Sequence, residues 1–318
     1  YGYKKPSDLS CWEKAYWYLR IMVDTNRFGA LSKKPRKLAV LGDNLLSGYS
    51  KISQLDDPEK VKLQMLDSIL SQTLMDGVKE DSQLYGTTMS LFARLKDFLS
   101  TPKDHFVLGI TVRELLVPTN EAIRKVPSKE VTDFARTYAK AILDVKKEGG
   151  LSTLIREWDT FTEDLALNKE RDLIVGLFSN IREKFPQTLA PFSETASQEE
   201  MDIILTTVTQ EYERRVGQKR KQRAGGDLES ATEFLLNYFG MKTHGGPEHF
   251  SASLEVDNWL KDKNGWYVGI SLKRTLRERW KQTYTSDIGY YDQYHVKNVI
   301  HILNNDFDLS DSKITELA

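Results

Sequence analysis

The chain has a single cysteine and no long apolar run, and each of these features argues against a class of protein. Cys11 cannot close an internal disulfide by itself. A chain of 318 residues without such a bond is expected to be a cytoplasmic protein, because that compartment is reducing. Its apolar runs are far shorter than the roughly 20 residues that cross a bilayer, so we expect no membrane partner.

Excess charge of one sign is also nearly absent from the chain as a whole. The net charge is −1, which alone argues against a nucleic-acid partner. Residues 212–285, however, carry 14 Lys and Arg against 9 Asp and Glu. The positive charge is therefore local, as a nucleic-acid-binding face requires, although a solvated surface is the alternative.

The first two hundred residues have helical periodicity. Apolar residues recur about every 3.6 positions over 59–76 and 131–145. Further helices are expected over 12–24, 84–99, 152–165 and 170–185, the last ended by Pro186. This part has no glycine-rich phosphate loop and no cluster of His, Cys and carboxylates, so we expect no nucleotide cofactor. A scaffold, a dimerisation or a DNA-specificity role stays open for it.

A linker is predicted by the segment PQTLAPFSETASQ, residues 186–198, which is rich in Pro, Ser and Thr. It places a boundary near residue 195, between a large all-α domain over 1–195 and a second domain over 196–318. The next helix is expected to end at Gly225-Gly226. A helical apolar stripe begins just before residue 318, so we expect the second domain to be cut short there.

The second domain changes character after these glycines. We expect a helix over 228–239, strands over 251–260 and 266–272 around an Asn264-Gly265 hairpin signal, a helix over 275–283 and a strand over 296–303. This order predicts an α/β (α+β) core with a mixed sheet flanked by helices.

Asp257 and Lys273 lie on the two strands of the predicted hairpin, where a carboxylate and an ammonium can meet. Hydrolysis of a phosphodiester needs an attacking water and neutralisation of the charge that develops on the phosphate. A carboxylate can hold Mg²⁺ for this purpose and an ammonium can orient the water. Ser271 is expected on the face of Lys273. The alternative is an exposed ion pair contributing less than about 1 kcal/mol.

Three segments, RAGGDLESATEFLL, LEVD and GISLKRTLRERWKQ, resemble the core of type II restriction endonucleases of the PD-(D/E)xK superfamily. The resemblance covers about residues 214–310. It implies that a helix acid, Glu229, a strand acid, Asp257, and Lys273 converge on Mg²⁺. The usual proline before the strand acid is Val256 here, and Ser271 replaces the acid that usually stands two positions before the lysine.

Serine at that position is similar to the EcoRII-like and CCGG-cutting branch of the family, in which a later glutamate takes the vacated place. Here that position is Ser286, and the nearest carboxylate is Asp287. The resemblance therefore implies Asp287 as the second metal ligand beside Asp257, with Glu278 as the substitute.

The Arg277, Glu278 and Arg279 run follows the lysine at the spacing of a triplet that contacts CC/GG in the same branch. Arginine can bridge guanine O6 and N7, and glutamate can accept from cytosine N4. The alternative is a charged helix with local ion pairs. Lys221 and Arg223 belong to a basic run that we expect to contact phosphates or to stabilise the end of its helix.

Together these residues lead us to expect a Mg²⁺-dependent, site-specific endonuclease of double-stranded DNA in a prokaryotic cytoplasm. The resemblance implies a type II restriction enzyme whose target contains CC/GG and which acts as a homodimer, because a symmetric target is cut on both strands. Two alternatives stay open. One is a repair or mobile-element nuclease with the same core, and the other is a DNA-binding protein whose nuclease core has decayed, as Ser271 suggests.

Overall fold

The structure is a computed structural model that describes residues 4–127, 132–145, 150–192, 197–250, 256–273, 288–303, 310 and 315. The helices are α1 (Cys11–Val23), α2 (Thr25–Phe28), α3 (Pro35–Ile52), α4 (Glu59–Met75), α5 (Gln83–Lys96), α6 (Pro102–Ile110), a π-helical segment η3 (Thr111–Leu116), α7 (Val117–Lys125), α8 (Thr132–Val145), α9 (Gly150–Leu189), α10 (Gln198–Tyr238) and α12 (Ile288–Gln293). Short 3₁₀ turns cover Pro6–Asp8 and Leu31–Lys33. The strands are β1 (Asn258–Lys261), β2 (Tyr267–Lys273) and β3 (Val296–Leu303). Within these ranges no helix has both the length and the apolar character of a membrane span.

Two compact units make up the chain. Unit 1 comprises Tyr1–Val126 and Lys169–Gly217, and unit 2 comprises Pro127–Asn168 and Gln218–Ala318. This partition differs from 1–195 and 196–318, because the long helices α9 and α10 each supply residues to both units. The expected boundary near residue 195 lies inside unit 1, and the limits of independently folding domains stay a prediction.

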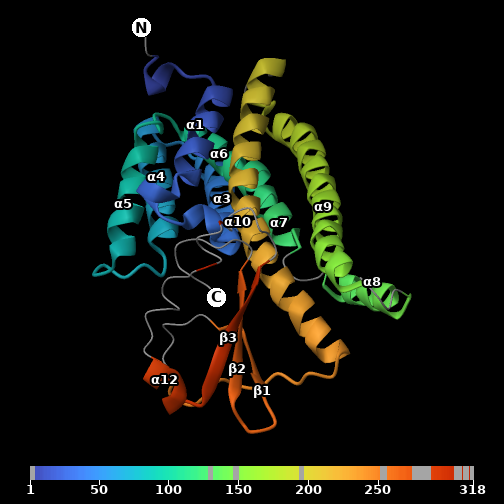
Figure 1. The fold of residues 1–318 in the computed structure, drawn as a ribbon. Coiled ribbons are helices and arrows are strands. Elements are labelled where there is room, and N and C mark those ends of the chain that lie inside the picture. The colour runs from blue at the N-terminus through green and yellow to red at the C-terminus, as the bar shows by residue number, and fades with distance from the viewer. Residues whose placement is uncertain are drawn as a thin grey trace. The chain divides into compact units, whose positions relative to one another are not determined.

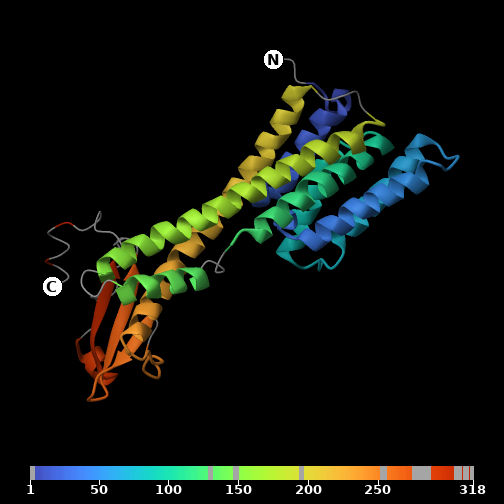
Figure 2. The ribbon, with the colours of Figure 1, turned by 90° about the vertical axis from the view of Figure 1, so that its right-hand side faces the viewer.

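Unit 1 is a helical assembly around one hydrophobic core. Its first long helix, α1, begins with a capping box: the Ser10 hydroxyl accepts from the Glu13 amide at 3.1 Å, and the Glu13 carboxylate accepts from the Ser10 amide at 2.8 Å. Helix α3 packs against both α4 and α6, as the two views in Figure 1 and Figure 2 show. Side chains from α1, α3, α4, α5, α6, η3, α7, α9 and α10 fill the core.

A buried ion pair joins α1 to the start of α6. The Lys14 ammonium lies 2.7 Å from the Asp104 carboxylate, and both side chains are almost fully buried. The other oxygen of Asp104 accepts from the amides of Ser100 and Thr101, at 2.8 Å each. The ion pair and the two amides together satisfy the hydrogen-bonding capacity of this buried carboxylate, which lowers the cost of burying it.

Gly109 lets α6 approach α3 closely. A Cβ at this position would lie 3.0 Å from the Leu46 Cγ and 3.1 Å from the Leu45 Cβ. Both leucines belong to the core, so they have little room to move. Gly86 on α5 is the contrasting case, because a Cβ there would meet nothing within 4 Å.

We therefore expect Gly109→Ala to lower the free energy of unfolding by about 1–3 kcal/mol through overpacking. Gly86→Ala, the matched control, should raise it by about 0.5–1 kcal/mol because alanine favours the helix. Urea denaturation of both variants measures the two effects. A stabilising Gly109→Ala would mean that the α3–α6 contact is looser than described.

A second polar cluster joins α4 to α5 and α6. The Asp67 carboxylate contacts the buried His105 ring at 2.9 Å and forms an ion pair with Lys96. Burial raises the pKa of Asp67, but hydrogen bonds and charge from His105 and Lys96 outweigh it and hold this pKa below its ordinary 3.8. A carboxyl group whose pKa is lower in the folded state stabilises the fold above its unfolded pKa, and this contribution disappears as the pH falls.

Asp67→Asn should accordingly lower the free energy of unfolding by about 1–2 kcal/mol at neutral pH. The difference from the unmodified protein should shrink as the pH falls below 3.8, the ordinary pKa of the group. Asp43→Asn on the exposed side of α3 serves as the control. Thermal unfolding at several pH values tests this, and a pH-independent difference would contradict it.

Two expected helix ends are wrong, because packing overrides the local signals. Pro186 lies inside α9, whose last turn is held by the fully buried Phe185 and Leu189. The segments 152–165 and 170–185 are therefore parts of one helix. Helix α10 continues through Gly225 and Gly226. Its residues beyond the glycines pack into two clusters of unit 2, and this packing offsets the roughly 1 kcal/mol that each glycine costs.

The sheet of unit 2 is mixed, as expected, with the order β1-β2-β3 (Figure 1). β1 pairs antiparallel with β2, and β3 pairs parallel with β2. The Asp262 carboxylate accepts from the amides of Asn264 and Trp266 in the β1–β2 turn, and Gly265 supplies a φ of 83°. Leu228 and Leu236 of α10 pack on Ile270 and Leu272 of β2. The predicted helix over 275–283 and the strand portion 251–255 lie outside the described residues.

Candidate active site

Asp257 lies immediately before β1 and is bound to β2 by two hydrogen bonds. Its amide donates to the Ile270 carbonyl at 2.9 Å, and its carboxylate accepts from the Leu272 amide at 2.6 Å. The second bond makes the side chain act as an extension of β1. An exposed carboxylate is thereby held in one orientation at the end of the hairpin.

Lys273 is the last residue of β2 and directly follows the residue whose amide Asp257 binds. Across the sheet it is paired with Leu303, the last residue of β3. The backbone therefore brings Lys273 to the end of the hairpin where the Asp257 carboxylate lies. The side chain of Lys273 is outside the described part of the structure.

Ser271 lies between Ile270 and Leu272 of β2 and is almost fully buried, with 2% of its surface exposed. Ile270 and Leu272 face α10, so Ser271 belongs to the opposite face of the sheet by alternation. Its burial limits what the hydroxyl can contact. Ser271 is thus closed off from solvent within the sheet.

Glu229 is exposed on α10, one residue after Leu228, which packs against β2. No contact joins Glu229 to Asp257, and among the described residues no three His, Cys, Asp or Glu side chains form a group that could hold a metal ion. Asp257 has one carboxylate oxygen open to a metal ion, because Oδ2 binds the Leu272 amide and Oδ1 accepts no hydrogen bond from a described residue. Asp287, the expected second ligand, lies outside the described residues.

Asp227 is an acid that the sequence reasoning missed. It is 5% exposed and lies one turn before the buried Ala231 of α10. Asp227 stands four residues before Ala231, so both side chains lie on the packed face of the helix. The helical spacing of the apolar residues could therefore have identified Asp227 as a buried acid. Asp227 is therefore the buried acid of this turn, whereas Glu229 points to solvent.

The expected DNA-contact residues have different surroundings. Lys221 is exposed on α10, where its ammonium can meet a phosphate. Arg223 is 4% exposed, and its guanidinium donates to the Pro127 carbonyl at 3.1 Å, so it stabilises unit 2 instead of facing a duplex. Arg277, Glu278 and Arg279 lie outside the described residues.

Comparison with known proteins adds no relative: no protein-family model, no curated protein and no solved structure matches the chain.

The hydrogen bond between Asp257 and Leu272 has a measurable consequence. Asp257→Ala removes the acceptor, so the Leu272 amide should exchange with deuterium about tenfold faster or more. Glu229→Ala removes a carboxylate without touching this bond and should leave that exchange unchanged. Residue-resolved hydrogen exchange by NMR is the measurement. Equal exchange rates in Asp257→Ala and the unmodified protein would show that the carboxylate is not bound to β2.

Proposed function

We propose that unit 2 is the catalytic unit of a Mg²⁺-dependent, site-specific endonuclease of double-stranded DNA with a PD-(D/E)xK core. The observation that carries the proposal is the bond from the Asp257 carboxylate to the amide directly before Lys273. It supports a site in which an acid and a lysine act at one point. A type II restriction enzyme with CC/GG in its target is the member of this class that we favour.

Asp257 would hold the metal ion and Lys273 would act on the attacking water. One oxygen of Asp257 is already used by the backbone, which orients the other as a hard donor of the kind that Mg²⁺ prefers. When bound, Mg²⁺ neutralises charge on the scissile phosphate and makes a bound water more acidic. The Lys273 ammonium would orient that water and offset the charge that develops on the phosphate oxygens. Asp287 is proposed as the second ligand.

Binding of a duplex is supported by the local excess of basic residues over 212–285 and by the exposure of Lys221. We propose that Lys221 contacts a phosphate and that Arg277, Glu278 and Arg279 contact base edges. A homodimer would place two such sites on the two strands of a symmetric target. Arg223 is left out of this surface because it is buried.

Lys273→Ala should lower the rate of Mg²⁺-dependent plasmid cleavage by about a hundredfold or more, because the group that acts on the water is lost. Lys263→Ala is the matched control, since it removes an exposed lysine from the β1–β2 turn of the same hairpin. Gel analysis of plasmid with Mg²⁺ and with a chelator measures both. Equal cleavage by Lys273→Ala and Lys263→Ala would remove Lys273 from the active site.

A DNA-binding protein with a decayed nuclease core is the second candidate, and the burial of Ser271 favours it. The residue that replaces the usual acid has almost no access to solvent, so it cannot supply the missing ligand. In that case the unmodified protein would retain a duplex in a gel-shift experiment but leave it uncut with Mg²⁺. Cleavage that a chelator abolishes would exclude this candidate.

A further inference from the structure

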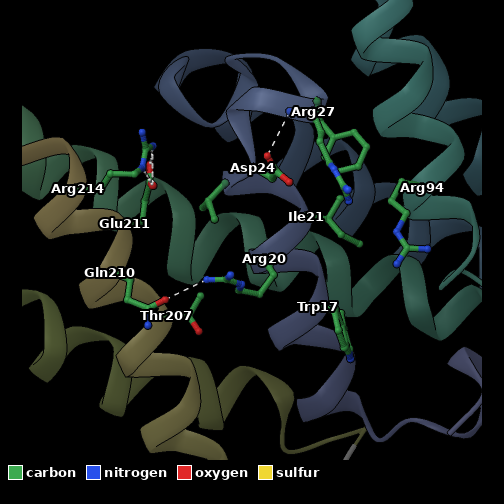
Figure 3. A pocket seen from close by; sticks show the side chains of 12 residues that line it. Trp17, Arg20, Ile21, Asp24, Arg27, Arg94, Thr207, Gln210, Glu211 and Arg214 are labelled. Carbon is green, nitrogen blue, oxygen red and sulfur yellow. Dashed lines mark hydrogen bonds and ion pairs between the residues drawn. The ribbon is translucent and has the colours of Figure 1, made fainter. Parts of the chain in front are cut away.

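Unit 1 contains a pocket whose chemistry the proposed nuclease site does not use. Its volume is about 430 Å³, within the range of about 300–1,000 Å³ that is typical of small-molecule sites. Residues of α1, α2, α5 and α10 line it, as Figure 3 shows. Four of them are arginines, Arg20, Arg27, Arg94 and Arg214, against two acids, so the lining is positively charged.

Both acids of the lining already have partners. Glu211 is 4% exposed and binds the Arg214 guanidinium through both oxygens, at distances from 2.7 to 2.9 Å. The Asp24 carboxylate accepts from the Arg27 amide at 3.2 Å and so caps α2. Among the described residues, neither acid forms an ion pair with Arg20, Arg27 or Arg94.

None of these three arginines is held in a buried ion pair among the described residues. Arg20 donates to the neutral side-chain amide of Gln210 at 3.0 Å, and among the described residues neither Arg20 nor Arg27 forms an ion pair (Figure 3). Arg94 is paired with Asp97 at 2.8 Å, but both side chains are about half exposed. Such a pair contributes little, so a better-placed anion can replace it.

One wall of the pocket is aromatic and apolar. Trp17 is 39% exposed, and its ring is stacked on Phe98 with the centroids 5.8 Å apart. Ile21 and Phe28 continue the apolar lining. A large aromatic side chain left open to solvent at a basic pocket suits a ligand that joins a flat ring to an anion.

We propose that this pocket binds a nucleoside monophosphate, with its phosphate between Arg27 and Arg94 and its base against Trp17. Inorganic phosphate alone would leave the aromatic wall uncovered and fill only a small part of the volume. Guanidinium groups bind phosphate oxygens directly. The site therefore needs no glycine-rich loop, the sequence signal whose absence led us to expect no nucleotide. The proposal is independent of the nuclease activity.

Isothermal titration of the full chain with adenosine monophosphate tests the proposal, with adenosine, inorganic phosphate and a short DNA duplex as separate titrants. We expect the monophosphate to bind at least about tenfold more tightly than adenosine or phosphate. Arg27→Ala should weaken this binding by about tenfold or more, because a charge-assisted hydrogen bond is lost. Arg182→Ala removes an exposed arginine of α9 outside the pocket and should change nothing.

Trp17→Phe tests the proposed contact with the base, because it keeps a ring against Phe98 while reducing the stacking surface. It should weaken binding of the monophosphate but not of inorganic phosphate. Thermal unfolding of each variant shows whether unit 1 remains folded. Equal affinity for phosphate and monophosphate, binding unchanged in Arg27→Ala, or an arginine-dependent affinity seen only with the duplex would each overturn the proposal.

Discussion

The hydrogen bonding of β2 on both sides is the constraint on which unit 2 depends. β1 pairs with it along one edge and β3 along the other, so its backbone has little freedom. Where β1 has not yet begun, the Asp257 carboxylate replaces the missing backbone carbonyl and binds the Leu272 amide. One side chain thus both extends the sheet and is oriented by it. A catalytic carboxylate needs such preorganisation, because an acid that rotates freely holds a metal ion poorly.

Hydrophobic packing against α10 keeps the central strand β2 in place. Ile270 and Leu272 alternate with Ser271 and face Leu228 and Leu236 of α10. The face of β2 that carries Ser271 is thereby turned away from the helix. Arg223 on α10 is also buried and binds the Pro127 carbonyl, so this polar side chain contributes to contacts within unit 2.

Periodicity predicted the elements well and their limits poorly. The stripes over 59–76 and 131–145, the Asn264-Gly265 turn and the strand over 296–303 correspond to α4, α8, the β1–β2 turn and β3. Pro186 and Gly225-Gly226 led to wrong helix ends, because their effect on a helix is local. Tertiary contacts outweigh this effect, and they are made by Phe185, Leu189 and Leu235. The short helix α12 has no strong periodic signal and was not predicted.

Within the candidate site, spacing across a hairpin predicts that Asp257 and Lys273 lie at the same end of it, because strand register follows from the turn. Burial could not be inferred in the same way. Arg223 has the composition of a phosphate contact, yet a backbone carbonyl of unit 2 binds it. The pocket of unit 1 could not be predicted from the sequence either, because its arginines are far apart in the chain and come together only when the helices pack.

Digestion of a genome of known sequence, followed by sequencing of the fragment ends, tests the central claim most directly. If the protein is a site-specific endonuclease, the fragment ends will share one short sequence, here containing CC/GG. These ends will appear only with Mg²⁺. Asp257→Asn should yield no such ends. Fragments whose ends share no sequence, or intact DNA in the presence of Mg²⁺, would contradict the claim.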